Sequence, residues 1–407
     1  MVKSLLFISL ITLPCSAGTP AADIPEPTPP WLSFSLESRL RYEMRNEQGL
    51  DNSHALTLRA RPGLQIGRDT GFSAFIQSEH TLALIDDYQV GTPQSARFDP
   101  YVPGNTVIGD PENNELNQLY LQYHSDSLLL RAGRQRLILD NASMIGNVGW
   151  RQNEQTLDAA LVSYTSGPLT VQYAYANRVN RIFGNDATGA VQALEGDVHL
   201  LNAAWKIGKH SVHGYIYLMD FSEQQFARAS NNTYGAFTDL NFDHGSYHLE
   251  VAAQNESGQQ PDYTALYGHV NFSKKSGDYT FVTGVEYLEQ DFVTPLATVH
   301  AFNGFADVFI NDRLGLTGGP AQWNGLTDVY AGISTQAPYD IKLSATAHAF
   351  FDDELDDFYG WEIDAVAVKQ IAENTKLIAK FAQFFANDDT AFANDVSQFS
   401  LQLDFTY

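Results

Sequence analysis

Arginine is the residue whose distribution most suggests chemistry in this sequence. Of 15 arginines, 13 lie before residue 182, whereas every lysine except Lys3 lies after residue 205. One residue separates Arg39 from Arg41, and one separates Arg59 from Arg61, so each pair shares a face if the chain is extended. A guanidinium binds carboxylates through a two-pronged set of hydrogen bonds. The spacing therefore predicts a basic surface that recognises anions, provided that neighbouring strands bring the pairs together.

The arginine pairs belong to segments in which apolar and polar residues alternate. Residues 32–45 place mostly apolar side chains at even positions, whereas the odd positions from Glu37 onward are all charged. Residues 56–66 repeat this pattern around Arg59 and Arg61. Alternation with period two predicts strands, and a strand with one apolar and one charged face separates two different solvents. No apolar run approaches the roughly 18 residues of a membrane-spanning helix.

Two kinds of link join the predicted strands, and the two kinds alternate strictly along the chain. Eight links are short and rich in turn residues: 69–71, 124–127, 165–168, 207–210, 243–245, 274–277, 337–340 and 372–375. Nine links are longer and polar: 46–52, 86–114, 137–153, 181–195, 222–232, 257–262, 291–325, 352–357 and 388–395. Seventeen links join 18 strands, because we place the extra apolar segment 302–310 inside a long link.

The sequence therefore predicts an all-β fold, a transmembrane antiparallel β-barrel of 18 strands in the outer membrane of a Gram-negative bacterium. Short periplasmic turns and long extracellular loops are typical of such barrels. The barrel is expected to occupy residues 31–407 as a single domain. Outer-membrane lipid and lipopolysaccharide would surround it. The last strand alternates to an aromatic C-terminus, and we expect the barrel-assembly machinery to bind there through Phe405 and Tyr407.

The N-terminus has the layout of a secretory signal peptide. Lys3 precedes an apolar run, and small residues follow at 16–18, so we predict a signal peptide at 1–17 with cleavage after Ala17. The alternative is a lipoprotein signal that acylates Cys15, which Pro14 makes a poor substrate. Residues 18–30 are rich in proline and are predicted to form an extended leader.

Inward faces of the predicted barrel carry charges of opposite sign on different arcs of the wall. The early strands place five arginines inward: Arg39, Arg41, Arg59, Arg61 and Arg131. Later strands place four carboxylates inward: Glu250, Glu286, Glu362 and Asp364. An arc of arginines at a constriction favours anions. The alternative is that these arginines pair with carboxylates on adjacent strands and only hold the wall together.

The long link 137–153 is the second candidate site. It is rich in glycine and amide residues and carries Arg151 next to a tryptophan, so it would narrow the pore if it folded into the lumen. The alternative is a solvent-exposed loop. Arg134 and Arg136 precede the link; strict alternation from Arg131 points both outward, unless a bulge near Gly133 turns them or they lie above the bilayer.

Several blocks of this sequence resemble a signature of the alginate-export family of outer-membrane proteins. They are residues 133–136 (GRQR), 140–141 (DN), 146–156 (GNVGWRQNEQT), 302–307 (FNGFAD) and 325–330 (GLTDVY). The resemblance runs from about residue 35 to the C-terminus, and the blocks between 133 and 156 are its most specific part.

The resemblance implies an 18-stranded barrel whose arginine-rich lumen exports an anionic uronic-acid polysaccharide or serves as a porin. It also implies that Arg39, Arg59, Arg134 and Arg151 contact the anion. We therefore expect an outer-membrane channel for anionic, sugar-acid-like solutes or polysaccharide, with the eight arginines 39, 41, 59, 61, 131, 134, 136 and 151 lining the pore. The alternatives are a weakly selective general diffusion porin and a surface-binding barrel plugged by its loops.

Other classes of function have little support in the sequence. The net charge of −24 argues against a nucleic-acid partner, which requires a basic surface. The 11 histidines show no pair at metal-ligand spacing with a third ligand, so no metal and no cofactor is predicted. Neither a nucleophile elbow nor a phosphate loop is present, and no enzyme is predicted. The run 352–357 offers acidic ligands for Ca²⁺ or, alternatively, forms a solvated loop tip.

Overall fold

A computed structural model describes residues 31–91, 99–222, 224–257, 262–315 and 323–407 of the chain. The predicted signal peptide at 1–17 and the predicted leader at 18–30 lie outside the described residues, so both stay predictions. Within the described residues, the one α-helix spans five residues, and no helix is long and apolar enough to cross a membrane.

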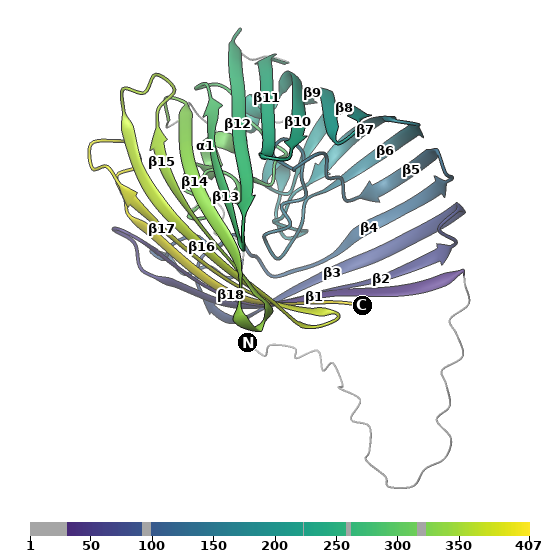
Figure 1. The fold of residues 1–407 in the computed structure, drawn as a ribbon. Coiled ribbons are helices and arrows are strands. Elements are labelled where there is room, and N and C mark those ends of the chain that lie inside the picture. Colours follow the sequence, from purple (N-terminus) through teal and green to yellow (C-terminus); the bar gives the residue numbers. More distant parts are fainter. Residues whose placement is uncertain (1–30, 92–98, 223, 258–261, 316–322) are drawn as a thin grey trace, which may run out of the picture.

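The described residues form one antiparallel sheet of 18 strands that closes on itself, as the count of links predicts (Figure 1). The strands are β1 (Leu32–Glu47), β2 (Ser53–Gly67), β3 (Gly71–Asp87), β4 (Asn113–His124), β5 (Leu128–Gln135), β6 (Thr156–Ser166), β7 (Leu169–Asn180), β8 (Ala193–Ile207), β9 (His210–Phe221), β10 (Asn231–Phe242), β11 (Gly245–Glu256), β12 (Thr264–Ser276), β13 (Tyr279–Leu288), β14 (Leu326–Ala337), β15 (Ile341–Phe351), β16 (Phe358–Ala372), β17 (Thr375–Ala386) and β18 (Val396–Thr406).

Links between the strands alternate between short turns and long loops, as predicted. The segment 302–310 forms no strand in the structure and lies in the link between β13 and β14, where the helix α1 (Ile310–Leu314) begins. Short 3-10 helices occupy Gly189–Val191, Gln224–Ala229, Val299–Ala301 and Pro338–Asp340. The prediction that 302–310 belongs to a long link is therefore confirmed.

Pairing of β1 with β18 closes the barrel. Eleven residue pairs run from Glu37 opposite Thr406 to Glu47 opposite Val396. Beyond them, the backbone N–H of Tyr407 donates to the carbonyl of Leu36 at 2.9 Å, and the reverse bond has the same length. The aromatic C-terminus is thus tied into the seam, and no strand of the barrel is left with an unpaired edge, which lipid would not tolerate.

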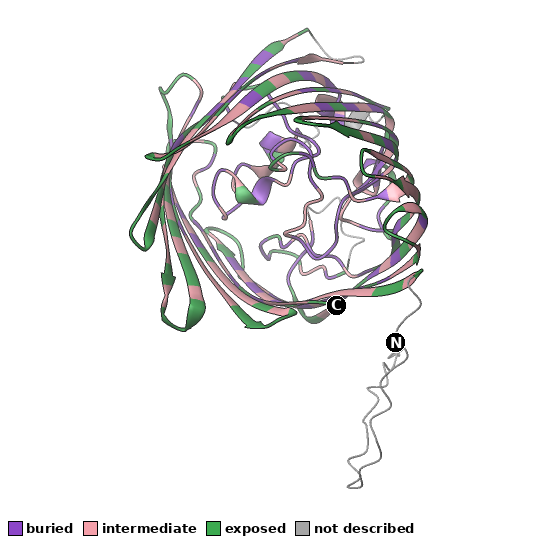
Figure 2. Cartoon of the chain, turned by 45° about the vertical axis from the view of Figure 1, so that its right-hand side comes forward, coloured by how far each residue is buried: buried purple, intermediate pink, exposed green. Residues whose placement is uncertain are grey.

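The period-two pattern sorts side chains between the two faces of the wall as the sequence predicts. In β1, Phe34 is 58% exposed on the outer face whereas Arg41 is fully buried on the inner one. Figure 2 shows the resulting alternation of exposed and buried residues along the strands around the ring. The outer face is apolar and suits lipid, and the charged residues of β1 and β2 point inward.

Part of the lumen is a hydrophobic core, which the sequence argument did not predict. Apolar side chains on the inner faces of β6 to β14 pack against apolar residues of the long links, including Ile145, Leu296, Phe309 and Trp323. The physical reason is that these links fold inward and carry large apolar side chains, which must be covered. Polar side chains also line the inner wall, among them Arg41 and Arg61 on β1 and β2 and Glu250 and Glu286 on β11 and β13.

Candidate functional site

Two long links enter the barrel and meet inside it, and we call them the first inner loop (136–155) and the second inner loop (289–315 and 323–325) (Figure 2). Ile145 of the first forms a parallel bridge with Leu296 of the second. The N–H of Gly146 donates to the carbonyl of Leu296 at 2.7 Å. Of the two alternatives for link 137–153, entry into the lumen is therefore the one that the structure contains.

The arginine pairs of β1 and β2 hold the first inner loop against the wall. Arg39 donates to the carbonyls of Gly149, Trp150 and Arg151 at 2.9–3.1 Å, and Arg41 donates to that of Trp150. Arg59 and Arg61 share the carbonyl of Gln152 at 3.3 and 3.0 Å. Because the irregular backbone of this loop pairs only some of its carbonyls internally, these guanidiniums supply the donors that the carbonyls of 149–152 require.

Most of these arginines also form ion pairs. Arg39 lies 2.8 Å from Asp404 and Arg41 lies 3.3 Å from Glu43. Further carboxylates belong to loops or to the next strand: Asp110 pairs with Arg41, and both Glu79 and Glu154 pair with Arg61. Arg59 forms no ion pair with any described residue. The wall-stabilising alternative therefore describes much of the cluster, although the loop carboxylates Asp110 and Glu154 are partners that the sequence did not indicate.

The remaining predicted arginines divide between the two faces. Arg131 points inward, donates to Gln122 at 2.7–2.9 Å and lies over the ring of Tyr120. Arg134 lies on the outer face, where it pairs with Asp158 at 2.7 Å. Strand pairing runs through Gly133 without a register shift, so the expected bulge is absent there. The prediction that Arg134 lines the pore is therefore corrected: the pleat turns it outward.

Arg136 and Glu154 tie together the two ends of the first inner loop. Arg136 follows the last residue of β5, turns inward and donates to Glu154 at 2.6 Å and to Glu37 at 3.1 Å. Burial alone would raise the pKa of Glu154, but Arg61 and Arg136 outweigh it and lower this pKa to about 2. The carboxylate therefore stays ionised and fixes the loop base.

Arg151, near the C-terminal end of the same loop, bridges the wall and the second inner loop. It lies 3.1 Å from Glu43 of β1 and 3.3 Å from Asp307. Burial works to lower the pKa of Arg151, but the nearby carboxylates outweigh it and keep this pKa above its ordinary value.

The acidic arc anchors the second inner loop in the complementary way. Glu362 and Asp364 of β16 accept the backbone N–H groups of Ala306 at 2.8 Å and Phe305 at 3.1 Å. Gly304 has a positive φ of 85°, and a Cβ atom there would lie 2.5 Å from the carboxyl group of Glu362, so only glycine lets the loop approach this closely. Carboxylates thus hold N–H groups on one arc, while guanidiniums hold carbonyls on the other.

Glu286 and Glu250, the other predicted acidic residues, also point inward but have different partners. Glu286 pairs with Arg313 of α1 at 2.9 Å. Glu250 accepts a hydrogen bond of 2.7 Å from the hydroxyl of Tyr215 and lies 3.3 Å from Nε2 of His248. Glu250 is therefore bound by wall residues and not by an inner loop.

The two inner loops meet in a basic, aromatic junction formed by Trp150, His300, Phe305 and Lys380. The rings of Trp150 and His300 stack at 4.0 Å. The ammonium of Lys380, from β17, lies 4.0 Å from the ring centre of Trp150 and 4.3 Å from that of Phe305, and it forms no ion pair among the described residues. Cation–π contacts of this kind leave the positive charge unneutralised.

His300 contributes a neutral ring to this junction. Its Nδ1 lies 3.0 Å from both oxygens of Asp307, so the hydrogen that it donates there leaves Nε2 as the acceptor. Burial lowers the pKa of His300 to about 3 despite the carboxylate. Sequence reasoning noted the blocks 146–156 and 302–307 separately, but no sequence signal indicated that they touch or that Lys380 lies between them.

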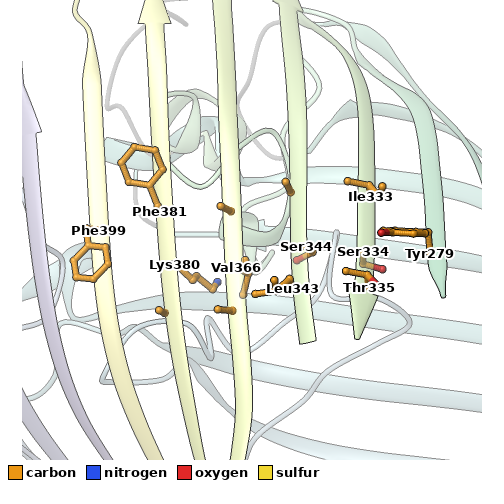
Figure 3. Close-up of a pocket in the computed structure, with 14 residues that line it drawn as sticks. Tyr279, Ile333, Ser334, Thr335, Leu343, Ser344, Val366, Lys380, Phe381 and Phe399 are labelled. Carbon is orange, nitrogen blue, oxygen red and sulfur yellow. The ribbon is translucent and has the colours of Figure 1, made fainter. Parts of the chain in front are cut away.

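A hollow on the outer wall is of another kind (Figure 3). Small residues of β14–β17 form its floor, and Tyr279 and Ile333 flank it on one side while Phe381 and Phe399 flank it on the other. The flanking rings and aliphatic groups suit lipid chains, so the polar candidate site remains the junction inside the barrel.

The acidic link 352–357, which offered ligands for Ca²⁺ as one alternative, is a tight turn. Asp352 accepts the N–H groups of Asp356 and Asp357 there.

A closed antiparallel barrel of 18 strands, with an apolar exterior and charged inner loops, has the architecture of outer-membrane porins. Crystal structures with this fold include Pseudomonas aeruginosa OccK9 (OpdG), with a TM-score of 0.67 and 13% identity over 92% of this chain and 98% of that one. Acinetobacter baumannii OccAB4 has a TM-score of 0.68 and 10% identity over 92% and 97%.

A third structure with this fold is that of P. aeruginosa OpdK with vanillate, with a TM-score of 0.65 and 10% identity over 92% of this chain and 98% of that one. No protein-family model matches this sequence, and no curated protein matches it significantly. The likeness to solved structures therefore establishes the porin fold, and the similarity to the alginate-export family stays a resemblance.

Proposed function

We propose that this chain is an outer-membrane channel for small anionic solutes, in particular carboxylates such as sugar acids. The observation that carries the proposal is the junction of the inner loops, where Lys380 holds an unpaired positive charge between two aromatic rings. A sugar acid matches this environment, because its C–H faces pack on aromatic rings and its carboxylate is attracted to the cation.

Other cations on the inner face of the barrel support the same class of solute. The side chain of Arg39 keeps 11% of its surface exposed and that of Arg136 keeps 27%, although both already have carboxylate partners. An anion that crosses the lumen would pass these guanidiniums either on its way to Lys380 or on its way from Lys380. Successive weak sites allow entry and release, which conduction requires.

Small solutes fit the interior better than a polymer does. Both inner loops are tied to the wall, the first through Arg39, Arg41, Arg59 and Arg61 and the second through Glu286, Glu362 and Asp364. Passage of an alginate-like polysaccharide, which the sequence resemblance implies, would require these loops to leave the lumen. The vanillate in the OpdK structure is itself a small carboxylate, and it supports the proposed class of solute without identifying one for this chain.

Replacing the two cations is expected to weaken anion preference. In planar bilayers with a salt gradient, the wild-type reversal potential should indicate a preference for anions. Lys380→Gln combined with Arg39→Gln should lower the anion-to-cation permeability ratio, because each charge that lies ~4 Å from the ion path stabilises an anion by about 1 kcal/mol in water, which is about fivefold in anion permeability alone. The control Lys209→Gln removes a charge from an exposed turn and should leave the ratio unchanged.

The same recordings separate the proposal from its alternatives. Equal permeation of neutral sugars and sugar acids, with a reversal potential near zero, would indicate a general diffusion porin. A folded barrel with no conductance would indicate that the loops plug it. Either result would contradict the proposed anion channel, as would a cation-selective current.

A further inference from the structure

Three potential metal ligands lie side by side on the inner face of β11 and β12. Glu250 of β11 is directly opposite His269 of β12 in the strand register. His248 precedes Glu250 by two positions, so the pleat places both on the same face. The neighbours Leu249 and Val251 are exposed on the outer face, which confirms that the three residues point into the barrel. Directly opposed side chains have Cβ atoms about 5 Å apart, which is close enough for them to share a ligand.

The potential donor atoms of these residues converge. One nitrogen from each histidine and one carboxylate oxygen all lie within 4.8 Å of one another. Nε2 of His248 lies 3.3 Å from Oε2 of Glu250. Two ligand atoms that are each about 2.0–2.1 Å from a tetrahedral ion are separated by about 3.3 Å, so this pair already has the required spacing. The third donor atom, on His269, lies within 4.8 Å of the other two, so a small side-chain rotation would complete the set.

His269 carries an unsatisfied nitrogen in this cluster. Its Nε2 is 2.8 Å from the hydroxyl of Tyr330, whereas Nδ1 has no hydrogen-bond partner among the described residues. The residue is only 8% exposed. A buried polar atom without a partner costs about 1–3 kcal/mol, and a bound cation would satisfy it.

Each of the three residues also has an outer partner that fixes its orientation. Nδ1 of His248 lies 2.8 Å from Asp239, which leaves Nε2 to face the cluster. Tyr215 donates to Oε1 of Glu250 at 2.7 Å, which leaves Oε2 to face Nε2 of His248 in the cluster. Metal-binding histidines usually donate their second nitrogen to a carboxylate or another acceptor, and ligating carboxylates are hydrogen-bonded in turn.

We propose that His248, Glu250 and His269 form a binding site for a divalent transition-metal ion, with Zn²⁺ as the best match. Two imidazoles with one carboxylate are a ligand set that zinc accepts, and three protein ligands leave a fourth position open to the lumen. The site links two adjacent strands and places positive charge on the acidic arc. Sequence spacing did not reveal it, because strand pairing and not a helical turn brings His269 to the other two.

Zinc titration of the purified barrel tests the site directly. Protein without a histidine tag is stripped with a chelator in detergent and titrated with Zn²⁺ against a chromophoric competitor. We expect one Zn²⁺ per chain, and binding at least about 10-fold weaker in Glu250→Gln and in His269→Ala. Asp239→Asn, which removes only the outer partner of His248, should weaken binding by about 10–100-fold. Co²⁺ bound in place of Zn²⁺ should give visible absorption bands that Glu250→Gln abolishes.

Controls separate loss of the site from loss of the fold. Glu250→Gln keeps the size of the side chain and an acceptor for Tyr215, so the barrel should retain its heat-modifiable mobility on a denaturing gel. His80→Ala, an exposed histidine on another strand, should bind Zn²⁺ like the wild type. Wild-type protein that retains no Zn²⁺ in the titration, or folded Glu250→Gln that binds as tightly as the wild type, would overturn the proposal.

Discussion

Arg313→Ala should release the second inner loop from the wall of the barrel. Arg313 is completely buried, and its two terminal nitrogens donate to the carboxylate of Glu286 at 2.9 and 3.1 Å, while it also donates to Asn303. The substitution leaves the buried carboxylate without its cation. Removing one partner of a buried ion pair typically destabilises by about 3–5 kcal/mol.

This loss should appear as local opening of the loop, because the strands around it keep their own hydrogen bonds. Hydrogen exchange followed by mass spectrometry would report it as faster exchange across 289–315, with the strands unchanged. The control Arg228→Ala removes a partly exposed arginine that lies 4.0 Å from Asp291 and should cost no more than about 1 kcal/mol.

A compensating variant tests the reason for the effect. Adding Glu286→Gln to Arg313→Ala removes the stranded charge and should restore part of the protection of the loop. If Arg313→Ala exchanges like the wild type, the ion pair does not hold the loop. If Glu286→Gln restores nothing, the packing of the arginine and not its charge is responsible.

The barrel itself could be predicted because its signals are local. Alternation of side chains follows from the pleat of each strand, and hairpin connections join neighbours in sequence. The inward placement of Arg39, Arg41, Arg59 and Arg61, and the place of 302–310 in a long link, needed nothing beyond these rules. Arg134 also follows the rule of alternation, which places it outward; the prediction that it lines the pore came from a bulge near Gly133 that the structure does not contain.

The interior could not be predicted because its contacts join segments far apart in the chain. Ile145 meets Leu296, and Trp150 stacks on His300. These contacts depend on the course of the two loops, which no periodicity in the sequence indicates. Partners of the arginines were missed for the same reason, since Asp110 and Glu154 come from loops. A cluster of like charges in the sequence therefore indicated a basic lumen, while the structure surrounds most of these charges with carboxylates and carbonyl groups.

Acid should loosen the first inner loop through Glu154. In the folded loop, Arg61 and Arg136 overcome the effect of burial and hold the pKa of Glu154 at about 2, against an ordinary value of 4.5. A carboxyl group whose pKa is lower in the closed loop stabilises that loop fully above pH 4.5, and the stabilisation is lost as the pH falls toward 2. A difference of this size corresponds to about 3 kcal/mol at neutral pH.

Pepsin, which is active across this pH range, provides the measurement. Cleavage within 136–155 of the folded wild-type barrel should increase steeply between pH 4.5 and 2. Glu154→Gln should be cleaved faster than the wild type at pH 4.5, and the difference should vanish near pH 2. Asp158→Asn is the matched control, because its partner Arg134 lies on the outer face and does not touch the loop.

Comparison of the two curves isolates Glu154 from the other groups near the loop. His300 remains neutral until about pH 3 because burial lowers its pKa, so its protonation overlaps the lower part of the same range. Since His300 is present in both proteins, its contribution cancels in the difference between wild type and Glu154→Gln. A difference that stays constant from pH 4.5 to 2 would mean that the ionised carboxylate of Glu154 does not hold the loop, and that the amide contacts of Asn117 and Asn147 suffice.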